Sequence, residues 1–138
     1  MASNEGRVHF SLAGYNFNPD DITRVLGIEP TAIDSSGALR GLDKPAISSW
    51  ELSTDKVADG LDIFSLTDEL IKLIEPKKDK LMKLIEGYNL APRIGVVLLL
   101  SSEKGASKPE VGFGSRTIRF LAEIGAFIDI DYQISTTA

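Results

Sequence analysis

Hydrophobic and polar residues alternate along three stretches of the chain, a pattern typical of strands with one buried face. The stretches are residues 7–13, 48–52 and 127–134. Residues 93–101 form a fourth predicted strand, which differs because it is apolar on both faces. Strands of that kind are usually covered on both sides.

Apolar residues recur at helical spacing between these strands. The first predicted helix covers residues 19–26, and a helical pair begins at Asp62 with an interruption at Pro76, since proline cannot continue a helix interior. A last helix is expected to begin with Ser115 as its cap and to end at Gly125.

The predicted order is strand, helix, strand, two helices, strand, helix, strand. Without the helical pair, this is the βαββαβ order of a ferredoxin-like fold. The 138 residues suit one domain. We therefore predict a single α+β domain over residues 1–138, a two-layer sandwich with a mainly antiparallel sheet and helices on one face. Loops are expected over residues 29–45 and 102–114.

Composition narrows the classes of function. The chain has no cysteine, which excludes thiol catalysis and zinc–thiolate sites. A net charge of −5 makes nucleic acid an unfavourable partner, because binding it requires cations that neutralise phosphates. The longest apolar run, residues 94–100, is far shorter than the roughly 20 residues that cross a bilayer. We expect a cytoplasmic protein with neither nucleic acid nor membrane as a partner.

Several segments recur together in a known family. They are the amino-terminal strand and the segments NPDDIT (18–23), LGIEPT (26–31), SWEL (49–52) and the closing stretch 118–132. In this combination the chain resembles the bacterial family known as domain of unknown function 4279. The resemblance spans nearly the whole chain and implies the same fold unit. It implies no activity, because none is established for the family.

A glycine-rich turn before the last predicted helix is a candidate anion site. Backbone N–H groups at a helix start can bind phosphate or carboxylate. Cations in a first helical turn oppose the helix dipole unless an anion is bound there, and two arginines are expected in that turn. The alternative is a loop with solvated arginines. The candidate ligand-binding residues are Gly112, Gly114, Ser115, Arg116 and Arg119.

Residues that carry chemistry are few. His9 is the only histidine and lies in the middle of a predicted strand, with no nucleophile motif around any serine. Asp129 and Asp131 share one strand face but lack a third metal ligand. The lysines of residues 77–83 indicate a solvated helix face. We predict no catalytic residue, no metal site and no cofactor.

The strand over residues 93–101 provides the main functional hypothesis. Val97 and Leu99 point to the face opposite the helices, where a two-layer fold offers no cover. Either the loops 29–45 and 102–114 cover this face, or a second subunit or a ligand does.

The predicted interface consists of Val97, Leu99, Phe127 and Trp50. Trp50 is a large aromatic residue on a strand, and such a residue is either part of the core or an anchor for a partner. The leading hypothesis is a non-enzymatic protein-interaction module, either a homodimer through the open sheet face or a binder of a protein partner such as a toxin that it neutralises. The alternative is a small-ligand or anion sensor that uses residues 112–119.

Overall fold

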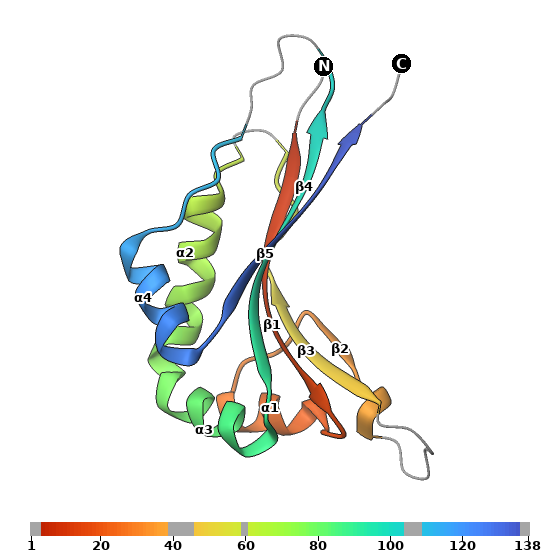
Figure 1. The fold of residues 1–138 in the computed structure, drawn as a ribbon, viewed down its shortest axis with the longest axis vertical. Helices are drawn as coiled ribbons and strands as arrows, with labels where there is room; N and C mark the ends of the chain where they lie inside the picture. Colours follow the sequence, from red (N-terminus) through yellow and green to blue (C-terminus); the bar gives the residue numbers. More distant parts are fainter. Residues whose placement is uncertain (1–3, 39–45, 59–60, 104–108, 136–138) are drawn as a thin grey trace.

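A computed structural model describes residues 4–38, 46–58, 61–103 and 109–135. The strands are β1 (Glu5–Tyr15), β2 (Ala32–Asp34), β3 (Ile47–Ser53), β4 (Ala91–Ser101) and β5 (Phe127–Ser135). The helices are α1 (Pro19–Leu26), α2 (Ile63–Ile74), α3 (Lys78–Tyr88) and α4 (Ser115–Ile124). Figure 1 shows two layers, with the helices on one side of the sheet. The predicted two-layer α+β fold is therefore confirmed.

The strand order of the sheet is β2-β3-β1-β4-β5. The central strand β1 pairs antiparallel with β3 and β4, and β2 pairs antiparallel with β3. β4 and β5 are parallel neighbours joined through α4, which supplies the crossover that a parallel pair requires. The sheet is mainly antiparallel, as predicted, with α2 and α3 as the inserted helical pair. The sequence did not predict the spatial order of the strands. In the structure β4 and β5 are direct neighbours.

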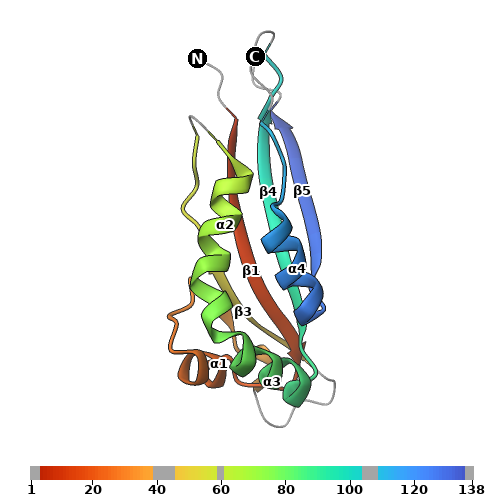
Figure 2. The ribbon, with the colours of Figure 1, turned by 90° about the vertical axis from the view of Figure 1, so that its left-hand side faces the viewer.

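The core lies between the sheet and the helices, with α2 and α4 in front of the strands (Figure 2). Val8, Phe10 and Leu12 alternate along β1 and are fully buried on the helix side. Complete burial of such a side chain contributes roughly 1.5–3 kcal/mol. The other large side chains that are almost completely buried are Ile22, Leu26, Trp50, Ile63, Ile71, Ile74, Leu81, Ile94 and Val96.

Trp50 belongs to this core and not to an interface. It is 0% exposed, and its Nε1 donates a hydrogen bond to Thr23 Oγ1 at 3.0 Å. The register of the sheet explains its position, because Trp50 lies opposite Leu12, which faces the helices. The prediction that Trp50 contributes to a surface on the other face is thereby corrected.

The helix ends follow the chemistry expected of their residues. Asn18 Oδ1 accepts a hydrogen bond from the Asp20 backbone N–H at 3.0 Å, and Gly27 ends α1 with a φ of 68°. Asp62 caps α2. The proline between α2 and α3 lies in a short 3₁₀ turn, Glu75–Lys77, so the predicted interruption is confirmed.

Two local predictions need correction. The N-cap of α4 is Gly114, without a side-chain cap, and Ser115 is the first helical residue. The expected loop over residues 29–45 contains β2, which Thr31 anchors by donating its backbone N–H to the Glu51 carbonyl at 2.7 Å. A strand of three residues is too short for alternation to reveal it. Residues 39–45 of this loop lie outside the described part of the chain.

Candidate functional site on the open face of the sheet

The side of the sheet opposite the helices, called the open face below, carries exposed apolar residues. Leu99 is 39% exposed and Phe127 is 53% exposed there. No described helix covers this face (Figure 1). The described part of the loop 102–114 leads to the helix side instead, since Glu110 bridges to Asp62 at the start of α2. The described residues of the loop 102–114 therefore give no support to the expectation that this loop covers the open face.

Polar side chains cross the middle of the open face. Arg7 Nη1 donates to Ser53 Oγ at 3.1 Å and lies 3.9 Å from Glu51 Oε2. Arg93 Nε donates to Ser11 Oγ at 3.3 Å, because the antiparallel register places these two residues opposite each other. The register of the strands places three more polar residues, His9, Asp129 and Asp131, on the same face. We name the whole set the polar belt; its members are Arg7, His9, Ser11, Glu51, Ser53, Arg93, Asp129 and Asp131.

His9 lies at the centre of the polar belt and is 6% exposed. Its ring packs against Gly95 so closely that a Cβ at position 95 would be 2.1 Å from His9 Nε2. His9 Nδ1 lies 3.2 Å from Glu51 Oε1, a distance of electrostatic attraction, but it does not have the geometry of a hydrogen bond. The His9 ring is therefore held in place by packing against Gly95 and not by an oriented hydrogen bond from Nδ1.

The environment of His9 favours the neutral imidazole. Burial lowers the pKa of His9 below its ordinary value. Arg7 and Arg93 lower this pKa further, while Glu51 and Asp129 raise it without reversing the shift. The centre of the open face is consequently uncharged at neutral pH, between two cations and the carboxylates around them.

A groove of about 270 Å³ lies beside the polar belt, toward the carboxyl end of β4. Val97 and Leu99 contribute apolar surface to its lining, and Arg7 and Asp131 contribute opposite charges. Val97 is half-buried. Of the residues that the sequence assigned to the interface, Val97 and Leu99 therefore lie together in one groove. Its full lining is Glu5, Gly6, Arg7, Lys56, Val97, Leu98, Leu99, Asp131 and Gln133.

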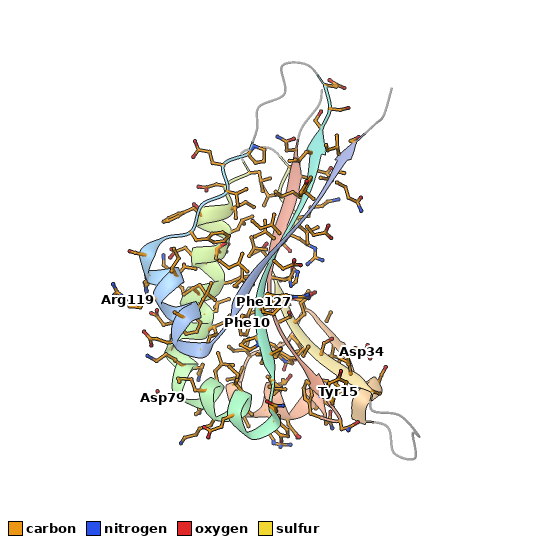
Figure 3. The ribbon with its side chains drawn as sticks, in the orientation of Figure 1. Phe10, Tyr15, Asp34, Asp79, Arg119 and Phe127 are labelled. Carbon is orange, nitrogen blue, oxygen red and sulfur yellow. The ribbon has the colours of Figure 1, made fainter. Side chains whose placement is uncertain are left out.

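The predicted anion site lies on the other side of the molecule, and its main cation is already paired. Both Nε and Nη2 of Arg116 donate to the Glu75 carboxylate, with Nε at 3.0 Å from Oε1. This bond lowers the pKa of Glu75 and raises that of Arg116. Arg119 is exposed on the outer side of α4 (Figure 3).

The glycines of that turn also have a packing role. A Cβ on Gly114 would lie 2.9 Å from the ring of Phe64, so this glycine allows the start of α4 to pack against α2. A Cβ on Gly112 would meet nothing within 4 Å beyond its own neighbours in the chain. The turn therefore offers an anion neither two unpaired arginines nor a backbone that encloses it.

Asp129 and Asp131 share one face of β5, as predicted, and the structure shows that this is the open face. Asp129 lies opposite Gly95 and Asp131 opposite Val97 in the parallel register. Within residues 4–38, 46–58, 61–103 and 109–135, no three groups of metal-ligating type gather to hold an ion. These two aspartates contribute charge to the face next to His9.

Sequence reasoning treated His9 alone and missed its neighbours. Arg7, Glu51 and Arg93 come from three strands, and only the strand order brings them together. One signal was present: Gly95 interrupts an apolar strand, and a glycine there often marks the close approach of another group.

These features define a two-layer α+β domain with an exposed, mixed apolar and charged sheet face. Residues 4–135 match the family described as domain of unknown function (DUF4279), and the chain belongs to that family. Searches of curated proteins and of solved structures gave no match. No described helix is both long enough and apolar enough to span a membrane.

Proposed function

We propose that the protein is a non-enzymatic interaction module and that a partner protein docks on its open face. The observation that carries this proposal is the exposure of Leu99 and Phe127 on a sheet face without helical cover. Single exposed apolar residues are ordinary. Here they flank the polar belt, and apolar anchors beside polar groups are the usual composition of a protein interface.

The charges of the open face indicate what kind of partner fits. Arg7 and Arg93 lie beside Glu51 and two aspartates, so the face offers both signs within a few residues. A protein surface with its own mixed charges can complement such a pattern, whereas a phosphate backbone cannot. The net charge of −5 favours a basic partner, of which a toxin is one example. The lack of cysteine fits a cytoplasmic location, which we include in the proposal.

The alternative function, an anion sensor at residues 112–119, has weaker support. Arg116 lies in the first turn of α4, and it already binds the carboxylate of Glu75. An incoming anion would have to displace that carboxylate. The open face requires no such exchange.

A comparative capture experiment tests the proposal. The tagged protein is incubated with lysate of its source cells beside two variants, Leu99→Asp on the open face and Leu73→Asp on α2. Leu73 is 55% exposed on the helix layer, so it provides a matched control. We expect a protein that the parent and Leu73→Asp retain and that Leu99→Asp loses. Equal capture by all three, or no capture by the parent, contradicts the proposal.

A further inference from the structure

The two edges of the sheet differ in a way that points to a second interaction surface. One edge is β2, which has three residues. The other is β5, which has nine and pairs with β4 in an unbroken register from Phe127 to Ser135. Short edges resist pairing with other chains, whereas long regular edges present a row of free backbone groups. In the strand order of the described residues, β5 is the last strand at this end of the sheet.

β5 carries two aspartates but lacks other features that protect an edge strand. Its sequence, FIDIDYQIS, contains no lysine and no proline. Its helix-side residues are also exposed, although they point to the layer that holds the core. The exposed fractions are 39% for Ile128, 46% for Ile130, 61% for Tyr132 and 58% for Ile134. Figure 2 shows β5 at the margin of the sheet.

We propose that this edge pairs with the same edge of a second copy of the chain, antiparallel, so that the two sheets become one. A two-fold axis perpendicular to the sheet keeps both helical layers on one side. It also joins the two open faces into one surface. This dimer forms along a sheet edge and not, as the sequence suggested for a homodimer, through the open face. It does not depend on the proposed function.

The charges of β5 select the register. Centring the pair on Asp131 would oppose this residue to itself, and centring it on Ile130 would oppose Asp129 to Asp131. Like charges directly opposite each other destabilise a sheet. Centring on Tyr132 opposes no two carboxylates, and of the residue-centred registers with that property it pairs the longest stretch of the described strand, residues 129–135.

In this register the side chains also match by type. On the helix side, Ile130 lies opposite Ile134 of the second copy, and the two Tyr132 rings lie opposite each other. On the open face, Asp131 lies opposite a glutamine, Gln133. Aromatic and β-branched pairs across strands stabilise sheets, and the pairing covers the exposed apolar residues of β5. The edge is therefore complementary to itself.

The test is the mass of the full chain in solution, measured by sedimentation equilibrium for the parent and four variants. We expect a dimer for the parent and at least a tenfold rise in its dissociation constant for Ile130→Lys, which places a charge against an isoleucine. Because Ile130 is 46% exposed, the lysine should leave the fold intact, and circular dichroism checks this.

A double variant fixes the register. In Ile130→Lys/Ile134→Glu, each introduced lysine faces the introduced glutamate of the other copy, so we expect the dimer to return. Ile118→Lys on α4, at a residue 53% exposed, and Leu99→Asp on the open face should both remain dimeric. A monomeric parent, a double variant that stays monomeric, or a dimer lost in Leu99→Asp but kept in Ile130→Lys overturns the proposal. None of these outcomes depends on capture of a partner at the open face.

Discussion

The imidazole of His9 on β1 rests on the backbone of Gly95, its direct neighbour in the register on β4. A side chain at position 95 would have its Cβ 2.1 Å from Nε2 and 2.3 Å from Cε1. Real contacts are never that short, so the ring and a larger residue cannot both keep these positions. The contact fixes the centre of the open face, and the flanking charges of the polar belt are arranged around it.

Gly95→Ala should therefore destabilise the protein. We expect a loss of about 1–3 kcal/mol in the free energy of unfolding, the usual cost of adding atoms to a packed site. Urea denaturation measures it. In the His9→Ala background the same substitution should cost clearly less, because the ring that it strikes is gone. An equal cost in both backgrounds would show that the contact does not determine the effect.

The pH dependence of stability should carry the signature of His9. Its pKa in the folded protein lies below the ordinary value of 6.5, so the unfolded chain takes up the proton first as the pH falls. The stability that the neutral ring contributes is present above pH 6.5 and is lost as the pH falls through 6.5 toward the folded pKa. Thermal unfolding should thus show a lower melting temperature at about pH 6 than at about pH 8.

His9→Gln provides the control for this pH dependence. The chain has one histidine and no cysteine, so few other side chains titrate between about pH 6 and pH 8. The variant should lose most of the difference in melting temperature between these two pH values. If the parent were more stable at the lower pH, or if the variant kept the full difference, His9 would not be the buried neutral group described above.

The hydrogen bond between Trp50 and Thr23 links α1 to the sheet and should contribute to the free energy of unfolding. Thr23→Val removes the acceptor and leaves the indole N–H without its partner in the core. We expect a loss of about 1–3 kcal/mol in the free energy of unfolding. Thr23→Ser keeps the hydroxyl and should lose much less. Thr23→Val retains the methyl group and Thr23→Ser removes it. A loss in Thr23→Ser as large as that in Thr23→Val would contradict the hydrogen bond as the main contribution of Thr23.

Inorganic phosphate should leave the melting temperature unchanged, because the guanidinium of Arg116 is already bound to the carboxylate of Glu75. A ligand at about 100 times its dissociation constant adds roughly 2.7 kcal/mol, which raises the melting temperature by several degrees. We expect no such shift in the parent. A clear shift that disappears in Arg116→Ala would restore the anion-sensor hypothesis for residues 112–119.

The sequence predicted the elements better than it predicted the site. Alternation along β1 and the capping residues Asn18 and Asp62 depend on neighbours in the chain, so those elements were predictable. The polar belt depends on strands far apart in the sequence, and their order is set by packing of the whole sheet. Trp50 shows the same limit, since an isolated aromatic residue does not reveal which face of its strand is covered.

The most direct test of the open face as a docking surface is the affinity of the captured partner. The purified partner is titrated by calorimetry into the parent, Leu99→Asp and the control Leu73→Asp. An aspartate in the apolar groove should raise the dissociation constant at least tenfold, about 1.4 kcal/mol, while the control binds like the parent. Equal affinity for the parent and Leu99→Asp would contradict the assignment of this face as the binding surface.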